Sequence, residues 1–184
     1  MEIKGTSVIQ TLSFVKVNFP NRYHEWIERL PEESKKILSQ QINPIAWYPL
    51  EASTVIPTRI IGEFFYANAK KGAIEVGKYS SSKSLTGVYK IFVRVADPKF
   101  MISRASNIFG SYYKPSEIST EIISNNEITV IFKKFTKTDL VLFNRIEGWI
   151  YSALILSKST GISTKSEELF INEEYIYKIN VKWQ

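Results

Sequence analysis

The last third of the chain changes its hydrophobic period once, and this change limits the folds open to it. From about Asp139 to Ser157, apolar side chains recur every three or four residues, as on one face of a helix. After Gly161 the period becomes two, which is typical of a half-buried strand. The helical stripe is Leu142, Ile146, Trp149, Ile150 and Ala153, and the alternating set is Tyr175, Tyr177, Ile179, Val181 and Trp183.

Two more strands are predicted upstream of this helix. They cover Glu117–Ser124 and Glu127–Phe135, and Asn125-Asn126 between them suits a hairpin turn. Asp139 is placed to cap the helix that follows. The order strand, strand, helix, strand, strand buries both apolar faces when the helix lies on one face of an antiparallel sheet. Residues 114–184 are therefore expected to form a four-stranded antiparallel sheet with a covering helix.

Residues 1–113 are expected to be helical, so the predicted fold class is α+β, a helical half packed on the sheet half. Pro57 is expected to kink one of the helices, and Asp97 with Pro98 is expected to begin another. Aromatic residues on both sides of the junction favour one continuous core and hence a single domain over residues 1–184. The helix-like stretches are Ser7–Phe19, Asn21–Leu30, Pro31–Gln40, Glu51–Asn68, Lys70–Ser82, Ser84–Val95 and Asp97–Gly110.

Composition excludes several classes of protein. The chain has 184 residues, of which 44% are hydrophobic, and this is enough for a core without metals or disulfides. The absence of cysteine excludes disulfides, thiolate metal sites and cysteine catalysis. No apolar run reaches the roughly 18 to 20 residues that span a bilayer, and the N-terminus shows no signal pattern. We expect no membrane span and a cytoplasmic protein.

The net charge of +6 makes nucleic acid the first charged partner to consider. The basic residues, however, are scattered singly or in pairs, with acidic residues among them, and no run of five occurs. This dispersal indicates a solvated surface, so nucleic acid is not expected as a partner.

No catalytic or metal-binding pattern stands out. His24 is the only histidine, and its neighbours Tyr23 and Glu25 offer no ligand set, so it is interpreted as a surface residue. The carboxylates occur as adjacent pairs, which point apart on a helix or strand. Gly77, like Gly87, lies in a helix-like stretch, and Gly148 lies beside Trp149; such glycines indicate close helix packing rather than phosphate binding. We expect no enzyme and no metal site.

The excess of aromatic residues is the remaining functional signal. Most of them belong to a core, but many are tyrosines, and an apolar cavity with a few hydroxyl groups is typical of a small-molecule site. The first hypothesis is a non-enzymatic sensor or adaptor that binds a small apolar or aromatic molecule between the two halves. The alternative is a protein-interaction or homodimerisation module with a filled core and no ligand. The expected ligand-binding residues are Trp47, Tyr48, Tyr89, Phe92 and Trp149.

A series of short landmarks resembles a bacterial haem-NO-binding-like family, which is distantly similar to vinyl-reductase-type (4-vinyl reductase) small-molecule-binding domains. The resemblance spans nearly the whole chain and depends on the order of the landmarks. It implies the ligand-binding fold of nitric-oxide sensors and Golgi transport subunits, which is often dimeric and senses rather than catalyses. The landmarks are Ile3–Thr6, Trp47–Pro49, Leu85–Tyr89, Tyr112-Tyr113, Gly148-Trp149 and Val181–Trp183.

The chain departs from this family at two places. Relatives often carry two cysteines in the last hairpin, where this chain has Leu169 and Tyr177, so the resemblance implies no metal there. Haem sensors use a proximal histidine and a Tyr-x-Ser-x-Arg motif. The stretch from Tyr79 to Lys83 matches that motif at Tyr79 and Ser81 but ends in lysine, and no histidine lies nearby. Haem is therefore not expected, and no other cofactor is.

Overall fold

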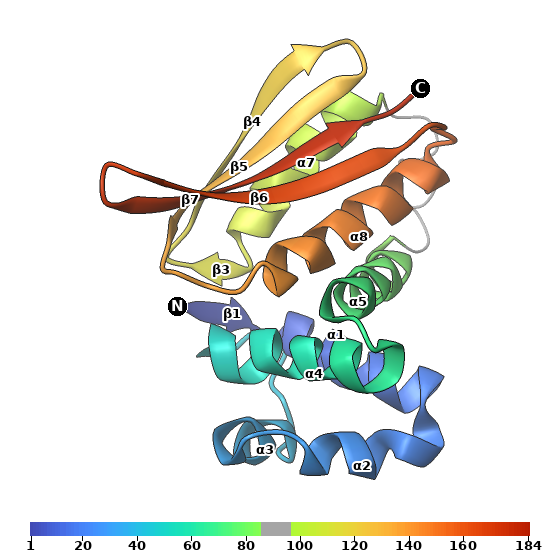
Figure 1. The fold of residues 1–184 in the computed structure, drawn as a ribbon, viewed down its shortest axis with the longest axis vertical. Helices are drawn as coiled ribbons and strands as arrows, with labels where there is room; N and C mark the ends of the chain where they lie inside the picture. Colours follow the sequence, from blue (N-terminus) through green and yellow to red (C-terminus); the bar gives the residue numbers. More distant parts are fainter. Residues whose placement is uncertain (86–96) are drawn as a thin grey trace.

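The computed structural model describes residues 1–85 and 97–184, and it places a sheet at one end of the molecule and helices at the other (Figure 1). The helix α5, Ala69–Ser84, lies between the two and contacts the helices α1, α4 and α8. The remaining helical elements are α1 (Gly5–Asn18), η1 (Pro20–Arg22), α2 (Tyr23–Glu28), α3 (Glu32–Leu38), η2 (Glu51–Val55), α4 (Ile56–Tyr66), α7 (Pro98–Gly110) and α8 (Val141–Leu156).

The predicted helical half is present, with one difference of detail. The stretch expected as one helix kinked at Pro57 is a π-helical segment, η2, followed by α4, and Pro57 lies in the first turn of α4, where its missing N–H costs nothing. Asp97 caps α7 as expected, because its side chain accepts hydrogen bonds from the backbone N–H groups of Lys99 and Phe100. The helix expected over Ser84–Val95 lies almost entirely outside the described residues.

The larger sheet confirms the predicted α+β class. Its strands are β4 (Glu117–Ser124), β5 (Glu127–Phe135), β6 (Ser163–Ile171) and β7 (Glu174–Lys182), all antiparallel in the order β4-β5-β7-β6. In β7, Tyr177, Ile179 and Val181 are completely buried, as their alternation predicts. The two central strands therefore carry the apolar face of the sheet.

Two helices, rather than one, cover this face (Figure 1). The predicted helix α8 packs on β6 and β7, while α7 packs on β4 and β5. The sequence placed α7 with the N-terminal helices, because periodicity shows which residues of a helix are apolar and not which surface they will meet. The buried stripe of α7 includes Met101, Ile102, Ala105 and Phe109.

A second, three-stranded sheet was not predicted. It pairs β1 (Glu2–Lys4) with β2 (Trp47–Pro49) on one side and with β3 (Tyr113–Lys114) on the other. Ile3, at its centre, is opposite Tyr48 and Tyr113. Strands of two or three residues are too short to show a period of two, so the sequence gives no signal for them.

The helices α5 and α8 cross at two glycines, as expected for Gly77 and Gly148. A methyl group on Gly77 would clash with the backbone carbonyl of Arg145, and one on Gly148 would clash with the backbone of Ile74. The two backbones are therefore in direct contact. This crossing joins the N-terminal helices to α8, one of the two helices that cover the sheet.

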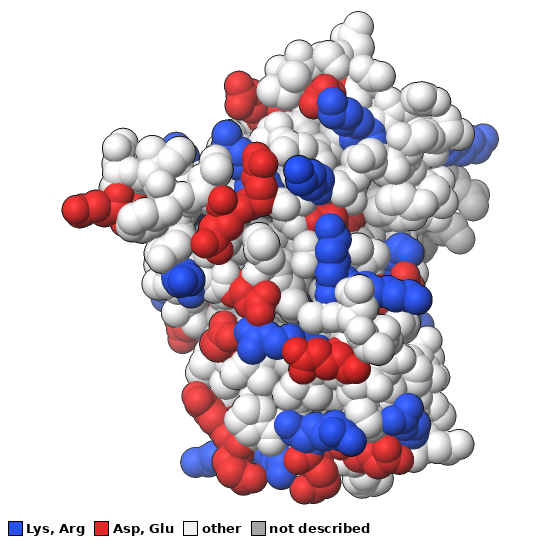
Figure 2. Space-filling view, viewed as in Figure 1, with Lys and Arg blue, Asp and Glu red and all other residues white. Residues whose placement is uncertain are grey.

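The surface mixes charges of both signs. In Figure 2, lysine and arginine side chains alternate with aspartate and glutamate over the face shown. Among residues 1–85 and 97–184, no helix is both long enough and apolar enough to cross a membrane.

Candidate ligand-binding cavity

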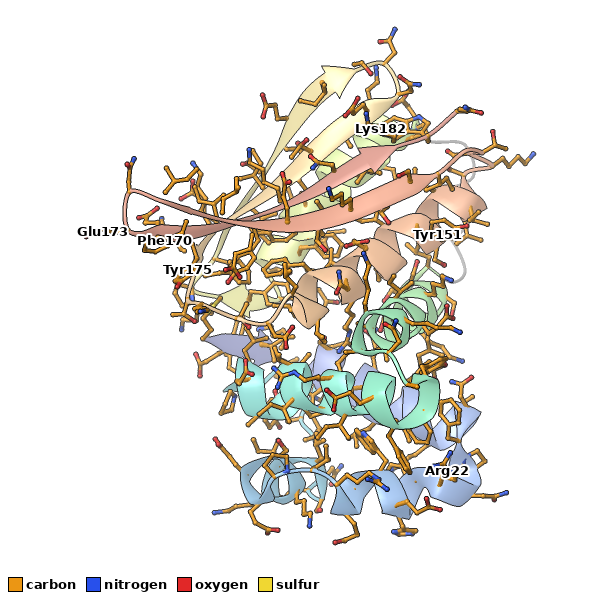
Figure 3. The ribbon with its side chains drawn as sticks, viewed as in Figure 1. Arg22, Tyr151, Phe170, Glu173, Tyr175 and Lys182 are labelled. Atoms are coloured by element: carbon orange, nitrogen blue, oxygen red, sulfur yellow. The ribbon has the colours of Figure 1, made fainter. Side chains whose placement is uncertain are left out.

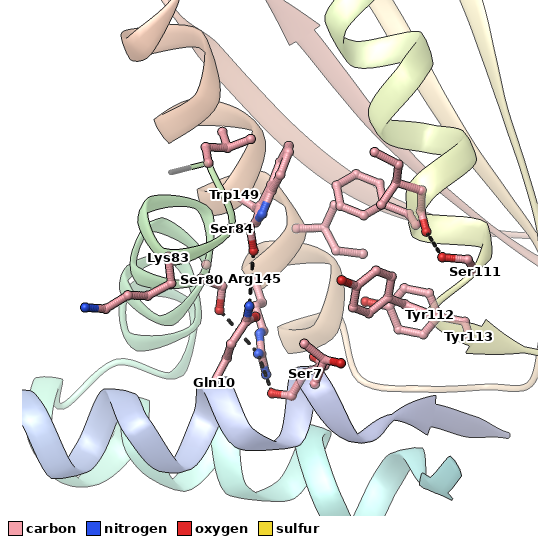
Figure 4. A pocket seen from close by; sticks show the side chains of 16 residues that line it. Ser7, Gln10, Ser80, Lys83, Ser84, Ser111, Tyr112, Tyr113, Arg145 and Trp149 are labelled. Atoms are coloured by element: carbon pink, nitrogen blue, oxygen red, sulfur yellow. Dashed lines mark hydrogen bonds between the residues drawn. The ribbon is translucent and has the colours of Figure 1, made fainter. Parts of the chain in front are cut away.

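A cavity of about 600 Å³ opens among the described residues where α1, α5, α8, the end of α7 and the segment after it meet (Figure 4). Its volume lies within the range of small-molecule sites, which is about 300 to 1,000 Å³. Residues of α5 and α8, the two helices that meet at the glycine crossing, line the cavity.

One wall of the cavity is apolar. Phe109 of α7 and Trp149 of α8 meet edge to face, with ring centroids 5.2 Å apart, and Ile146 lies one helical turn from Trp149. Trp149 belongs to the stripe that the sequence predicted, but it is only half-buried because it borders the cavity. This wall provides a flat aromatic and aliphatic surface against which a ligand can pack.

Two tyrosines after α7 add hydroxyl groups. Tyr112 and Tyr113 both line the cavity, and Figure 4 shows their rings on the side opposite α5. The small sheet positions them, since Tyr113 is opposite Ile3 and the Tyr112 carbonyl accepts a hydrogen bond from the Lys4 N–H at 3.0 Å. Burial raises the pKa of Tyr113 to about 12, so its hydroxyl is neutral near pH 7.

The sequence interpretation missed Arg145, a buried cation on α8. Its Nη1 donates to Thr11 Oγ1 at 2.8 Å and its Nη2 to the Ser7 carbonyl at 3.1 Å, so it reaches α1 as Figure 4 shows. Longer bonds run to Thr58 Oγ1 at 3.5 Å and Ser80 Oγ at 3.4 Å. Burial lowers the pKa of Arg145 to about 10. Its charge, one of two in a helix of mostly apolar residues, was the available sequence signal.

The three described residues among the five expected to bind a ligand do not gather in one place. Trp149 lines the cavity. Trp47 and Tyr48 lie in β2 and are not among the residues lining it. The ring of Trp47 packs under the ammonium group of Lys4, 4.1 Å from the ring centroid, and the Tyr48 hydroxyl accepts a hydrogen bond from the Asn43 N–H. Tyr89 and Phe92 lie outside the described residues.

Two further predictions can be placed in the structure. His24 is exposed on α2, beside Tyr23, as its interpretation as a surface residue predicts. In the stretch that partly matches the haem-sensor motif, Ser80 and Lys83 line the cavity, whereas Tyr79 packs edge to face on Phe14, with ring centroids 5.5 Å apart. The matching positions Tyr79 and Ser81 are therefore not the ones that border the cavity.

Comparison with solved structures gives consistent matches over almost the whole chain. The H-NOX protein from K. algicida, as an Fe(II) unliganded structure, matches with a TM-score of 0.71 and 13% identity over 99% of this chain and 97% of that one. The fold is that of H-NOX domains. An oxygen-binding H-NOX domain related to soluble guanylate cyclases matches with a TM-score of 0.68, at 14% identity over 99% of this chain and 95% of that one. No family model and no curated protein matches the sequence.

These matches correct one expectation and confirm another. The expectation that the chain takes no cofactor, haem included, is contradicted, because structures with the same fold include Fe(II) proteins. A further structure of this fold, from work on haem distortion in the H-NOX family, has a TM-score of 0.69 and 14% identity over 99% of this chain and 95% of that one. The nitric-oxide-sensor fold implied by the resemblance is confirmed. The similarity to vinyl-reductase-type domains stays a prediction.

The residues of the cavity limit how a haem could be held. Haem iron in proteins is held by histidine, cysteine, methionine or tyrosine. The chain has no cysteine, and its one histidine is exposed on α2, away from the cavity. Among the described lining residues, only Tyr112 and Tyr113 belong to these types. The donor set thus fits a haem through a phenol oxygen and not through an imidazole.

Proposed function

We propose that this chain is a ligand-binding sensor domain whose cavity takes a tetrapyrrole of the haem class. The observation that carries the proposal is the cavity of about 600 Å³ bordered by Phe109, Trp149 and two tyrosines. The H-NOX fold supports it, since solved structures of that fold include Fe(II) and oxygen-bound proteins. When bound, haem would supply an iron able to take up a small gas molecule.

The chain's own residues would hold this ligand in distinct ways. Phe109 and Trp149 would pack against the apolar ring system, and Tyr112 or Tyr113 would direct a phenol oxygen at its centre. α8 carries Trp149 and also packs on β6 and β7. A ligand that contacts α8 would therefore favour one packing of this helix against the sheet, which is a change that a partner could read.

Titration with haemin tests the proposal. We expect saturable binding of one haemin per chain, followed by the absorption band of the porphyrin. Tyr112→Phe or Tyr113→Phe should change the ferric spectrum, because the phenol oxygen is the expected iron ligand. Tyr151→Phe, on α8 and outside the lining residues, should not change it. Non-saturable binding, or a spectrum unaffected by both cavity variants, would contradict the proposal.

The small apolar or aromatic molecule expected from the sequence is a second candidate, favoured by the lack of an imidazole in the cavity. Comparing haemin with metal-free protoporphyrin IX separates the two, because only the first can form an iron–oxygen bond. Equal affinities would show that an iron–oxygen bond does not contribute to binding. The homodimer and the absence of enzymatic activity stay predictions.

A further inference from the structure

We propose that Arg145 is the recognition cation of the cavity, and that the ligand is an amphipathic carboxylate whose head group pairs with its guanidinium. This inference rests on the proposed function to the extent that the cavity must bind a ligand, and it names the chemistry that the ligand must carry.

Arg145 is a buried charge without an opposite charge. Its side chain is 5% exposed, and every hydrogen bond it makes ends on a neutral hydroxyl or carbonyl group. None of the ion pairs in the described part of the chain includes it. Residues 86–96 contain no aspartate or glutamate, so they cannot supply a counter-ion. Buried arginines are ordinarily paired, which makes this one exceptional.

Glu147, two residues further on, does not fill the role. Its carboxylate is 1% exposed and faces β6, where it accepts hydrogen bonds from the Ser166 N–H at 2.8 Å and from Thr164 Oγ1 at 3.3 Å. Asn144 Nδ2 also donates to it, at 2.9 Å. α8 thus buries two opposite charges that are satisfied by different neighbours. Of these two charged residues, only Arg145 borders the cavity.

The guanidinium retains capacity for a carboxylate. Its bonds to Thr58 and Ser80 are 3.5 and 3.4 Å long, beyond the usual N–H···O range, and a carboxylate would form shorter, charge-assisted bonds in their place. Ser80 itself lines the cavity. The lowered pKa of Arg145 has the direction that an unpaired buried cation takes, and a bound anion would reverse it.

The rest of the lining defines the ligand's other end. Phe109, Ile146 and Trp149 require an apolar body, while Arg145 requires an anionic head. Two sources share this chemistry, namely the propionate of a tetrapyrrole and the carboxylate of a long-chain acid. Each is a flat or flexible apolar body with a carboxylate at one end, and the experiment separates them.

The test compares each acid with a neutral molecule that has the same body. The probes are protoporphyrin IX with its dimethyl ester, and dodecanoic acid with dodecan-1-ol, all titrated into the full chain. We expect the acid of at least one pair to bind about tenfold or more tightly than its neutral partner, as a desolvated charge-assisted bond implies. Arg145→Met should abolish this difference. Arg104→Met, which removes an exposed arginine on α7, should preserve it.

The outcomes separate this inference from the proposed function. Equal affinity of acid and neutral partner in the unmodified chain overturns the inference and leaves the proposed ligand site standing. An Arg145-dependent preference for dodecanoic acid, with no tetrapyrrole binding, supports the inference and contradicts the haem proposal. Binding of none of the four probes overturns both. If Arg145→Met does not fold, Arg145→Lys should keep the acid preference, and its loss in that folded variant would count against the inference.

Discussion

Tyr177 shows how one hydroxyl group can fix a loop. Its ring is completely buried in β7 and stacks on Phe143 of α8, with centroids 4.1 Å apart. The hydroxyl accepts a hydrogen bond from the Thr138 N–H at 2.9 Å and donates one to the Thr138 carbonyl at 3.2 Å. The residues leading into α8 are thereby held against the sheet.

Removing this hydroxyl should have a pH-dependent effect. We expect Tyr177→Phe to lower the free energy of unfolding by about 1 to 3 kcal/mol at pH 7, because the Thr138 backbone groups lose their partner. Burial raises the pKa of Tyr177 to about 12. The stabilising effect of the neutral hydroxyl is then fully present below about pH 10, the ordinary tyrosine pKa, and is lost as the pH rises towards 12.

Urea denaturation of both proteins from pH 7 to pH 12 measures this effect. The difference in stability should shrink between pH 10 and 12, while groups common to both proteins cancel. Tyr151→Phe, which removes a hydroxyl from the outward side of α8, is the control (Figure 3). A Tyr177→Phe deficit that is constant with pH would show that the hydroxyl does not titrate as described.

At the residue scale, the sequence predicts which apolar residues are buried better than it predicts which polar residues are buried and what they contact. The stripe Leu142, Ile146 and Ile150 is buried as expected, because period alone determines which face of a helix is apolar. Arg145 and Glu147 were missed, since α8 is buried on several sides and the burial of its polar residues depends on neighbours far away in sequence. No local pattern specifies that Thr11 and Ser166 will meet them.

Among the elements, the crossing of α5 and α8 is the most sensitive to substitution. Gly148→Ala should lower the free energy of unfolding by about 1 to 3 kcal/mol, because the added methyl group would clash with the backbone of Ile74 and force the helices apart. Gly110→Ala is the matched control, since a methyl group there meets nothing within 4 Å and alanine favours a helix. Thermal unfolding measures the stability of both variants. Equal changes in stability would argue against a close crossing of the two helices.

The turn of the hairpin formed by β6 and β7 offers a substitution that should raise stability rather than lower it. The hairpin projects from the molecule, with Phe170 and Tyr175 in contact near its end (Figure 3), their ring centroids 4.8 Å apart. Its two turn residues, Asn172 and Glu173, have φ values of 50° and 64°. Both values lie in the left-handed region that glycine adopts without strain, and the turn type favours Asn-Gly.

We therefore expect Glu173→Gly to raise the free energy of unfolding by about 0.5 to 1 kcal/mol. Glu174→Gly changes the neighbouring residue, which is the first of β7, and it should instead lower stability, because glycine weakens a strand. Denaturant midpoints of the two variants give the comparison. Destabilisation by Glu173→Gly would contradict a turn of this type.

The elements themselves were predictable to different degrees. β4 and β5 have the predicted bounds, because each strand is long enough to show its pattern and Asn125-Asn126 separates them. β1, β2 and β3 were missed because pairing partners more than forty residues apart, and not local pattern, define them. The placement of α7 on the sheet was missed for the same reason.

For the molecule as a whole, the cavity forms where several elements meet. The sequence predicts these elements but not how they pack against one another. The prediction placed a pocket between the two halves. The described cavity is bordered by α1, α5, α7, α8 and the tyrosines after α7, so its lining comes from several elements. Trp149 could be singled out because it is the aromatic residue of the apolar stripe. Tyr112 and Tyr113 were recognised as a landmark of the family resemblance and as part of the junction, but not as ligand-binding residues.

The apolar wall should account for a measurable part of the affinity for haemin. Trp149→Ala is expected to weaken haemin binding about tenfold, because it removes one of the two rings that meet in the wall. Trp47→Ala removes the same side chain from β2, outside the lining residues, and should leave the affinity unchanged. Absorption titrations of the two variants measure these affinities. Equal losses of affinity would show that the cavity is not where haemin binds.

The glycine crossing has one more consequence for a molecule built in this way. Because no side chain separates Gly77 from Gly148, α5 and α8 cannot slide along each other without first coming apart. A ligand that widens the space beyond the crossing must instead rotate one of the two helices about this point, which then serves as a pivot. A swing of this kind would carry the far end of α8 across β6 and β7.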